Sequence, residues 1–219
     1  MPAPDSVGTR EPLRNPGGEL TRRDPSLRPF VRSGSDTIRG PRYASGMTTF
    51  RRFEDIEWNG WEPAQRATLL FVRRDGRLLL IEKKRGLGAG KINAPGGRIE
   101  PGETPAGAAV REVQEEVCVT PHAPVERGRL RFQFADGFSI SGAVFTADGC
   151  DGEPRETDEA VPLWIALPDI PYARMWADDR IWIPHMLGGR WFDGRFLFDG
   201  DAMLGYRLDV GVGPFTTRG

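Results

Sequence analysis

The stretch that decides the fold spans residues 97–119 and reads GRIEPGETPAGAAVREVQEEVCV. A glycine-containing loop leads into a segment with the spacing of a helix. Thr104 can cap the N-terminus of this helix, and Pro105 suits its first position, where the missing N–H leaves no donor unpaired. Ala109, Val113 and Val117 recur every four residues, so they predict one buried stripe along the helix.

A second face of the same helix carries three carboxylates, Glu112, Glu115 and Glu116, within reach of a shared ion. Like charges held this close repel, so the arrangement needs compensation. Hard oxygen ligands of this kind select Mg²⁺ or Mn²⁺. A solvated acidic helix face is the plainer alternative, and the three glutamates taken alone favour it.

The spacing of the whole stretch favours the metal site instead. Gly97 is followed after five residues by Glu103, and after seven more by Arg111-Glu112-Val113-Gln114-Glu115-Glu116. This pattern resembles the Nudix box, the signature of hydrolases that act on nucleoside diphosphates linked to another moiety. Cys118 is the one departure, because it stands where the box has a glycine. A glycine there ends the helix with positive φ, so we expect a different helix exit.

The composition excludes several classes of partner. The chain has 219 residues, 38% of them hydrophobic, and a net charge of −1, so nothing indicates bulk attraction to nucleic acid or to an anionic membrane. Its two cysteines have no metal-ligand spacing, which is compatible with a reducing compartment. The sequence contains neither a long apolar run nor a secretory signal. We therefore expect a cytoplasmic protein that needs no membrane and no nucleic acid polymer.

The chain divides into three parts by composition. Residues 1–46 are rich in Pro, Gly, Ser and Arg without apolar periodicity, so we expect a disordered N-terminal tail. Residues 47–66 include Phe53, Trp58 and Trp61, which is too apolar for a linker and predicts an extension that packs on the domain. Residues 67–219 form the predicted catalytic domain.

Strand patterns outnumber helices in that domain. Asp75-Gly76, Asp136-Gly137 and Asp193-Gly194 predict three hairpin turns, and Asp178 is expected to cap a helix that runs to Leu187. The expected strands are residues 67–73, 77–83, 129–134, 138–147, 161–165, 190–192, 195–198 and 205–210. These elements predict an α+β fold in which a mixed sheet lies between helices.

Segments outside the box extend the resemblance. They are similar to the human-type oxidised purine nucleoside triphosphatases, the MutT-homologue branch of the Nudix family, over about residues 67–210. The matching motifs are Lys83-Lys84-Arg85-Gly86, Gly88-Ala89-Gly90, Asn93 before Gly96-Gly97, Asp158-Glu159, Met175-Trp176, Asp178-Asp179, Trp182 and Pro184. The resemblance implies a Nudix α/β/α sandwich and a substrate such as 8-oxo-dGTP or 2-hydroxy-dATP. The implied products are the nucleoside monophosphate and pyrophosphate.

The same resemblance implies the roles of the charged residues. Mg²⁺, with Mn²⁺ as the alternative, would bind Glu112, Glu115 and Glu116, and the Gly96 carbonyl and Glu159 would complete the site. Either Glu115 or Glu116 could take a proton from the attacking water, because crowding raises a carboxyl pKa. Glu103 and Arg111 are expected to form a pair that fixes the loop against the helix.

A second set of residues is implied in substrate binding. Asn93, Trp176, Asp178 and Asp179 match the positions that read the base, and Thr68, Lys83, Gly96, Gly97 and Phe132 match positions that line the same site. Two adjacent aspartates in a closed pocket could read different purine edges, because a protonated one donates a hydrogen bond and an ionised one only accepts.

Each of these residues also has a plainer interpretation. Trp176 could simply pack, Asp178 and Asp179 could be a helix cap and a first-turn charge, and Lys83 could be an exposed strand end. His122 and His185 match no catalytic position.

Three departures leave the preferred substrate open. Leu87 replaces a phenylalanine of the human-type enzymes, and Ile140 and Ala160 replace methionines. The alternative is therefore a Nudix enzyme that acts on a methylated purine triphosphate or a dinucleotide polyphosphate. A Nudix-derived binding module without activity is a separate alternative, and we expect the protein to be a monomer.

Overall fold

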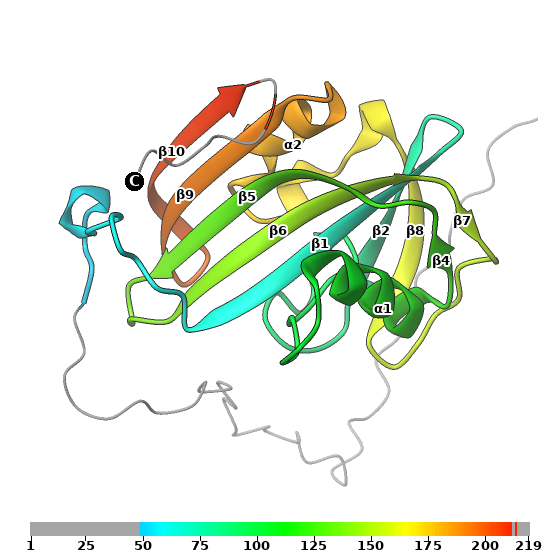
Figure 1. Cartoon of the computed structure of the whole chain (residues 1–219), viewed down its shortest axis with the longest axis horizontal. Coiled ribbons are helices and arrows are strands. Elements are labelled where there is room, and N and C mark those ends of the chain that lie inside the picture. The colour runs from blue at the N-terminus through cyan, green and yellow to red at the C-terminus, as the bar shows by residue number, and fades with distance from the viewer. Residues whose placement is uncertain (1–48, 212, 214–219) are drawn as a thin grey trace, which may run out of the picture. The chain divides into compact units, whose positions relative to one another are not determined.

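A mixed β-sheet lies between two helices in the computed structural model, which describes residues 49–211 and 213 (Figure 1). The strands run in the order β10-β9-β5-β6-β1-β2-β3, and β8 pairs with β2. The β1–β6 and β5–β9 pairs are parallel, and the others are antiparallel. The sheet consists of β1 (Gln65–Arg74), β2 (Arg77–Lys83), β3 (Ile92–Asn93), β5 (Val125–Phe134), β6 (Ser139–Asp148), β8 (Ala160–Ala166), β9 (Trp191–Asp199) and β10 (Ala202–Gly211).

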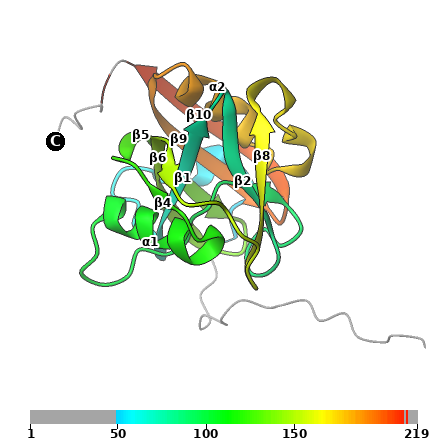
Figure 2. The ribbon, with the colours of Figure 1, turned by 90° about the vertical axis from the view of Figure 1, so that its right-hand side faces the viewer.

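The helices lie on opposite sides of this sheet, as Figure 2 shows in the end-on view. They are α1 (Pro105–Val117) and α2 (Asp179–Leu187). The remaining elements are a two-stranded sheet of β4 (Thr120–Pro121) and β7 (Cys150–Asp151), and the short 3-10 helices η1 (Phe53–Asp55), η2 (Leu167–Asp169) and η3 (Tyr172–Arg174). The predicted α+β fold with a helix on each side is confirmed.

Strand alternation divides the interior into two hydrophobic cores. Successive residues of a strand point to opposite faces. In β2, Leu79 and Ile81 therefore pack on the α1 side, whereas Leu78 and Leu80 pack on the α2 side. The predicted helix stripe lies in the first core, whose members include Ala109, Val113 and Val117. The second core contains Trp182, Ile183 and Met186 of α2.

The start of α1 follows the sequence prediction, but its end does not. The Thr104 hydroxyl accepts a hydrogen bond from the backbone N–H of Gly107 at 3.1 Å, and Pro105 is the first helical residue. We expected Cys118 to change the helix exit, and this was wrong. Cys118 adopts the left-handed conformation, with φ 63° and ψ 27°. A distant segment fixes this end of α1, because the Arg155 N–H donates to the Val117 carbonyl at 3.0 Å.

One predicted hairpin is also wrong. The turns at Asp75-Gly76 and Asp136-Gly137 join antiparallel strands as expected, but β9 runs without interruption through Asp193-Gly194. Its hairpin partner is β10, and Gly200 lies in the turn between them with φ 55°. Gly194 serves close packing instead, since a Cβ at this position would lie 2.5 Å from the Phe196 ring.

The described part of the N-terminal extension, from residue 49, contacts the sheet. Phe53 lies against Gly205 of β10, where a Cβ on the glycine would approach the Phe53 Cβ to 2.7 Å. β1 begins at Gln65, inside the segment assigned to the extension. The predicted disordered tail, residues 1–46, lies outside the described residues. Across residues 49–211, no helix has the length and apolar character needed to cross a membrane.

Replacing Cys118 by glycine should stabilise the protein by about 1 kcal/mol, because glycine adopts positive φ without the steric cost of a Cβ. The free energy of unfolding from urea titration measures this gain. Cys118→Ala is the matched control, since it removes the thiol and keeps the Cβ, and it should give no gain. Equal stability of the Gly and Ala variants would contradict the strain at this residue.

Candidate active site

The loop before α1 brings the backbone against the carboxylates. This loop is attached to β1, because the Thr68 N–H donates to the Gly97 carbonyl and the Leu70 N–H to the Pro95 carbonyl, both at 2.9 Å. A side chain on Gly97 would meet the Glu112 carboxylate, with the Cβ at 2.5 Å from its oxygens. Glycine is therefore required for the loop to approach α1 this closely.

Glu116 is the most buried carboxylate of the cluster, with a relative exposure of 1%. Its Oε1 accepts a hydrogen bond from Lys83 Nζ at 3.0 Å, and its Oε2 accepts one from the Gly96 N–H at 2.8 Å. Burial nevertheless raises its pKa, and the charge of Glu159 adds to that rise. The pKa of Glu112 is raised by burial too, with contributions from Glu116 and Glu115. These four carboxylates therefore lie close enough to interact electrostatically.

Arg111 connects the loop to the carboxylates. Its guanidinium binds both oxygens of Glu103, at 2.7 and 2.9 Å, and the Arg98 carbonyl at 3.0 Å. The same group reaches Glu112 at 3.0 Å and Glu115 at 2.8 Å. The hydrogen bond from Arg111 lowers the pKa of Glu103 to about 2, so this carboxylate stays ionised. The structure thus forms the expected pair and shows that Arg111 also holds the helix glutamates, which the sequence did not indicate.

Lys83 lies with the carboxylates, on the face away from α2. It follows Leu79 and Ile81 at two-residue spacing, so strand alternation directs it to the α1 side. Its bond to Glu116 excludes the interpretation of a merely exposed strand end. Its register partner Ala160 is fully buried in the core under α1. Ala160 was expected to reshape the base pocket, but the structure places it in that core.

Thr68 and Asn93 lie on β1 and β3, the strands on either side of β2. Thr68 is fully buried, and its hydroxyl has no hydrogen-bond partner among the described residues. Asn93 pairs with Ile81 in the sheet, and its side-chain oxygen accepts a hydrogen bond from the Ala94 N–H at 2.8 Å. Within residues 49–211, neither side chain makes a hydrogen bond to Trp176, Asp178 or Asp179.

The donor set fits a divalent cation, although the carboxylates would have to rearrange. Within the described part of the chain, no three acidic, histidine or cysteine side chains are positioned to hold an ion as they stand. Instead, basic side chains bind them, including Arg85 on Glu159. The Gly96 carbonyl accepts no hydrogen bond from the described residues and remains available. Carboxylate oxygens and a free carbonyl are the ligands that Mg²⁺ and Mn²⁺ prefer.

An aromatic group lies on the other side of the sheet, around Trp176. The Trp176 ring meets Phe198 edge to face at 5.6 Å and Phe134 at 6.5 Å between centroids. The Lys91 ammonium lies 4.9 Å from the centre of the Trp176 ring and binds Asp201 at 2.9 Å. Phe132 stacks on Phe196 at 5.5 Å in the same region. Sequence reasoning missed Lys91, which follows a glycine-rich turn and carries no periodic signal.

Two buried aspartates adjoin this aromatic group. Asp178 and Asp179 are 2% and 3% exposed. Asp178 Oδ2 accepts from the Trp182 indole N–H at 2.9 Å, while its Oδ1 is buried without a partner among residues 49–211. Asp179 Oδ2 accepts from the Trp176 N–H at 3.0 Å. Asp178 occupies the N-cap position of α2, and α2 ends at Leu187 as predicted, but the Asp178 side chain makes no capping bond to the helix.

Burial changes the protonation of this pair. Loss of hydration raises the pKa of Asp178 to about 6. It raises the pKa of Asp179 further, with a contribution from the Asp178 charge and opposition from Lys91. At neutral pH the pair can therefore hold one proton, which gives one donor and one acceptor side by side.

Sequence comparison identifies this arrangement. The NUDIX domain profile matches residues 63–186, more than half of the chain. The oxidized purine nucleoside triphosphate hydrolase of Danio rerio is 42% identical over 144 residues, which cover 65% of this chain and 92% of the relative. The protein of the same name from Mus musculus is 38% identical over 143 residues, with 64% and 92% covered. The chain belongs to the Nudix family.

The fold comparison agrees with the family. The crystal structure of the MutT protein from Bacillus halodurans superimposes with a TM-score of 0.61 at 29% identity, over 66% of this chain and 97% of that one. The carboxylates of α1 are therefore those of a Nudix box, and the chain is a Nudix hydrolase. The boundaries proposed for the domain, residues 67–219, begin slightly after the region matched by the profile.

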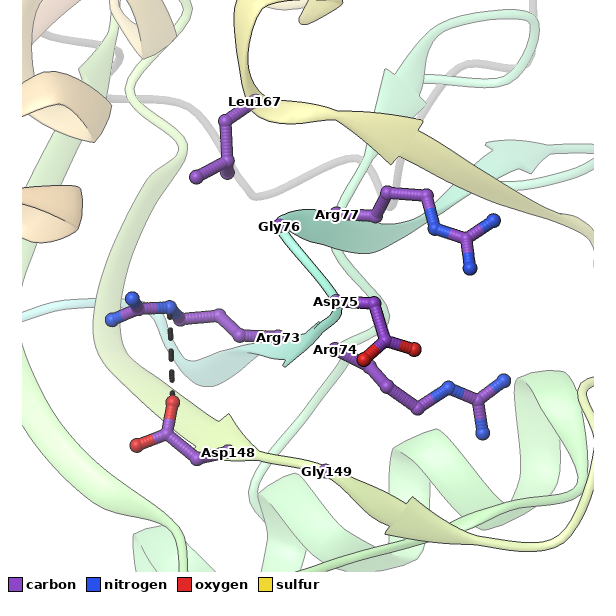
Figure 3. A pocket seen from close by; sticks show the side chains of 8 residues that line it. All are labelled: Arg73, Arg74, Asp75, Gly76, Arg77, Asp148, Gly149 and Leu167. Carbon is purple, nitrogen blue, oxygen red and sulfur yellow. Dashed lines mark ion pairs between the residues drawn. The ribbon is translucent and has the colours of Figure 1, made fainter.

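One pocket lies away from the Nudix box. It has a volume of about 370 Å³ and surrounds the β1–β2 turn at Gly76. Arg77 and Lys83 mark the two ends of β2, so the turn is about 20 Å from the carboxylates along the strand. Figure 3 shows Arg73 directed to Asp148 and Arg74 and Arg77 directed the opposite way. The arginines do not converge on one point, so this pocket is not an anion site.

The raised pKa of Asp178 predicts a pH-dependent stability. The folded chain binds this proton more tightly than the unfolded chain, whose aspartate has a pKa of about 3.9. The stabilisation is thus complete below pH 4 and lost as the pH rises through 6. Asp178→Asn cannot ionise and keeps an acceptor for Trp182. Its free energy of unfolding relative to wild type should rise by about 2 kcal/mol between pH 4 and pH 7.5.

Denaturant titrations at several pH values measure this difference directly. A difference between the two proteins that stays constant across the pH range would contradict the assignment.

Proposed function

We propose that this Nudix hydrolase cleaves oxidised purine nucleoside triphosphates, such as 8-oxo-dGTP and 2-hydroxy-dATP, to the nucleoside monophosphate and pyrophosphate. The observation that carries the proposal is the buried Asp178–Asp179 pair next to Trp176, on the opposite side of the sheet from the carboxylate cluster. The names of the vertebrate relatives support the same substrate class. In this reading the protein removes damaged nucleotides before a polymerase can use them.

The aspartate pair suits a base whose hydrogen-bond pattern has changed. Oxidation of a purine converts ring positions from acceptors to donors or adds a carbonyl oxygen. A neutral Asp178 or Asp179 donates to such an oxygen, and its ionised neighbour accepts from a ring N–H. Trp176 supplies a flat apolar surface for the purine face. Lys91 lies against that indole and gives it a cation partner.

The carboxylate cluster suits the triphosphate. Mg²⁺ held by Glu112, Glu115, Glu116, Glu159 and the Gly96 carbonyl would neutralise phosphate charge and lower the pKa of bound water. Lys83 orients Glu116, and Arg111 orients Glu112 and Glu115. Both oxygens of Glu116 have protein partners. Glu115 is half exposed and uses only Oε2, so its Oε1 is free to accept a proton from water.

Two of the three residues that differ from the human-type enzymes, Leu87 and Ile140, keep a methylated purine triphosphate as a second candidate substrate. Leu87 is 53% exposed and smaller than the phenylalanine of the human-type enzymes, and its neighbour Gly88 lies against the Trp176 ring. Ile140 is buried as the register partner of Phe132 and also changes the shape of this side. The use of Mg²⁺, the monomeric state and the cytoplasmic location stay predictions.

Pyrophosphate release across a panel of oxidised, methylated and normal purine triphosphates tests the proposal. The oxidised substrates should give the highest kcat/KM with Mg²⁺, and EDTA should abolish turnover. Glu115→Gln should lower kcat about 10³-fold without unfolding the chain, because it removes a proton acceptor and a metal ligand at an exposed position.

Glu100→Gln is the matched control, since this exposed carboxylate lies just before the helix and outside the cluster. It should keep nearly full activity. Equal kcat/KM for oxidised and normal purines would sink the substrate assignment, and near-normal turnover by Glu115→Gln would sink the catalytic one.

A further inference from the structure

The described part of the N-terminal extension is residues 49–64. All but its last two residues lie before the region matched by the NUDIX profile. It nevertheless makes specific hydrogen bonds to the sheet. The Trp61 indole N–H donates to Gln133 Oε1 at 2.9 Å, and the Ala64 N–H donates to Ser139 Oγ at 3.0 Å. Both acceptors are almost fully buried, at 4% and 5% exposure. These contacts are therefore built into the folded domain and are not loose surface contacts.

The two acceptors are direct neighbours in the sheet. Gln133 of β5 and Ser139 of β6 are register partners. The next pair along the hairpin is Phe132 with Ile140. Because side chains alternate, the first pair faces the extension and the second pair faces the α2 side. The extension therefore binds one face of β5 and β6, and the opposite face of these strands carries residues of the predicted base pocket.

Gln133 links the extension to the backbone of the β5–β6 hairpin. Its Nε2 donates to the carbonyls of Phe134 and Phe138, at 3.1 and 3.0 Å. The amide therefore uses its oxygen for the extension and its nitrogen for the two strand ends. Phe134 lies 6.0 Å from Phe198 and 6.5 Å from Trp176, ring centre to ring centre. A shift of these strand ends would move Phe134 against both rings.

Aromatic stacking positions the donor itself. Trp58 lies between its neighbours, 5.3 Å from Phe53 and 5.7 Å from Trp61. Phe53 in turn packs on Gly205 of β10. Figure 1 shows this blue segment beside the ends of β5 and β6. Trp58 has a buried indole N–H with no partner among the described residues, so it contributes its ring and no hydrogen bond.

We propose that residues 49–64 are a positioning element for purine binding, which acts through the Trp61–Gln133 hydrogen bond on the wall formed by Phe132, Phe134, Phe198 and Trp176. The proposal rests on the function proposed above for the site. It assigns Trp61 and Gln133 as positioning residues, because neither touches the reacting atoms. The carboxylate cluster lies on other elements, so substrate affinity should depend on this contact and the chemical step should not.

Trp61→Phe in the full chain tests the proposal, since it keeps a ring and removes the single donor. KM for 8-oxo-dGTP should rise about fivefold, because this factor corresponds to the net free energy of one hydrogen bond. The kcat should change less than twofold. Hydrogen exchange should also quicken at the Phe134 and Gly137 amides, which bond within the β5–β6 hairpin.

Trp58→Phe is the matched control, because it changes the same stack and removes no hydrogen bond. It should leave both KM and hairpin exchange as in wild type. If the two variants behave alike in both measurements, the proposal is overturned. If the wild-type protein does not hydrolyse 8-oxo-dGTP, the proposed function fails, and the exchange comparison still decides whether the extension holds the hairpin.

Discussion

The buried carboxylate of Glu116 is the constraint on which the rest of the site depends. A charge with 1% exposure is costly unless hydrogen bonds and an opposite charge compensate for its lost hydration. Lys83 from β2 and the Gly96 N–H from the loop provide both. This one side chain therefore ties α1, the sheet and the loop before α1 into a fixed arrangement. Glycines at 96 and 97 allow the loop to come this close, because a Cβ at 96 would lie 2.1 Å from the Thr68 carbonyl oxygen and one at 97 would lie 2.5 Å from the Glu112 carboxylate.

The two environments that a nucleotide needs lie on opposite faces of the sheet and adjoin at the end of β2, where the N–H of Lys83, which binds Glu116, donates to the carbonyl of Lys91, which lies on Trp176. On the α1 side the carboxylates pair with Lys83 and Arg111, and this charged cluster suits phosphate and a divalent cation. On the α2 side the surroundings are aromatic, and burial raises the pKa of Asp178 and Asp179, which suits a neutral base. Strand alternation alone makes this separation possible, since Leu80 and Ile81 are neighbours in sequence and belong to different cores.

Local chemistry was predictable from the sequence where it depends on spacing. The Thr104 cap, the helix stripe and the carboxylate face of α1 follow from periodicity. The Asp193-Gly194 pair failed as a turn signal, because a glycine required by the neighbouring Phe196 ring looks the same in sequence as a turn glycine. The prediction of a changed helix end at Cys118 failed for a related reason. Contacts from residues 155–157 impose a backbone conformation that a cysteine does not itself prefer.

Contacts between distant segments were not predictable. The resemblance placed Lys83 among the substrate-binding positions, but its bond to Glu116 was not predictable, because no sequence rule states which face of a strand meets which helix. The Trp61–Gln133 bond joins residues that are 72 positions apart, and the orphaned oxygen of Asp178 becomes visible only when its burial is known. Physical pairing across the fold, and not local propensity, determines these features.

We propose that the Glu112, Glu115 and Glu116 carboxylates exchange their basic partners for a divalent cation. Electron paramagnetic resonance of free Mn²⁺ during titration with protein measures this binding directly, without any nucleotide. The wild-type chain should remove free Mn²⁺ from solution, and Glu116→Gln should weaken that binding at least about tenfold, while Glu100→Gln binds as wild type. Equal Mn²⁺ binding by wild type and Glu116→Gln would contradict the account.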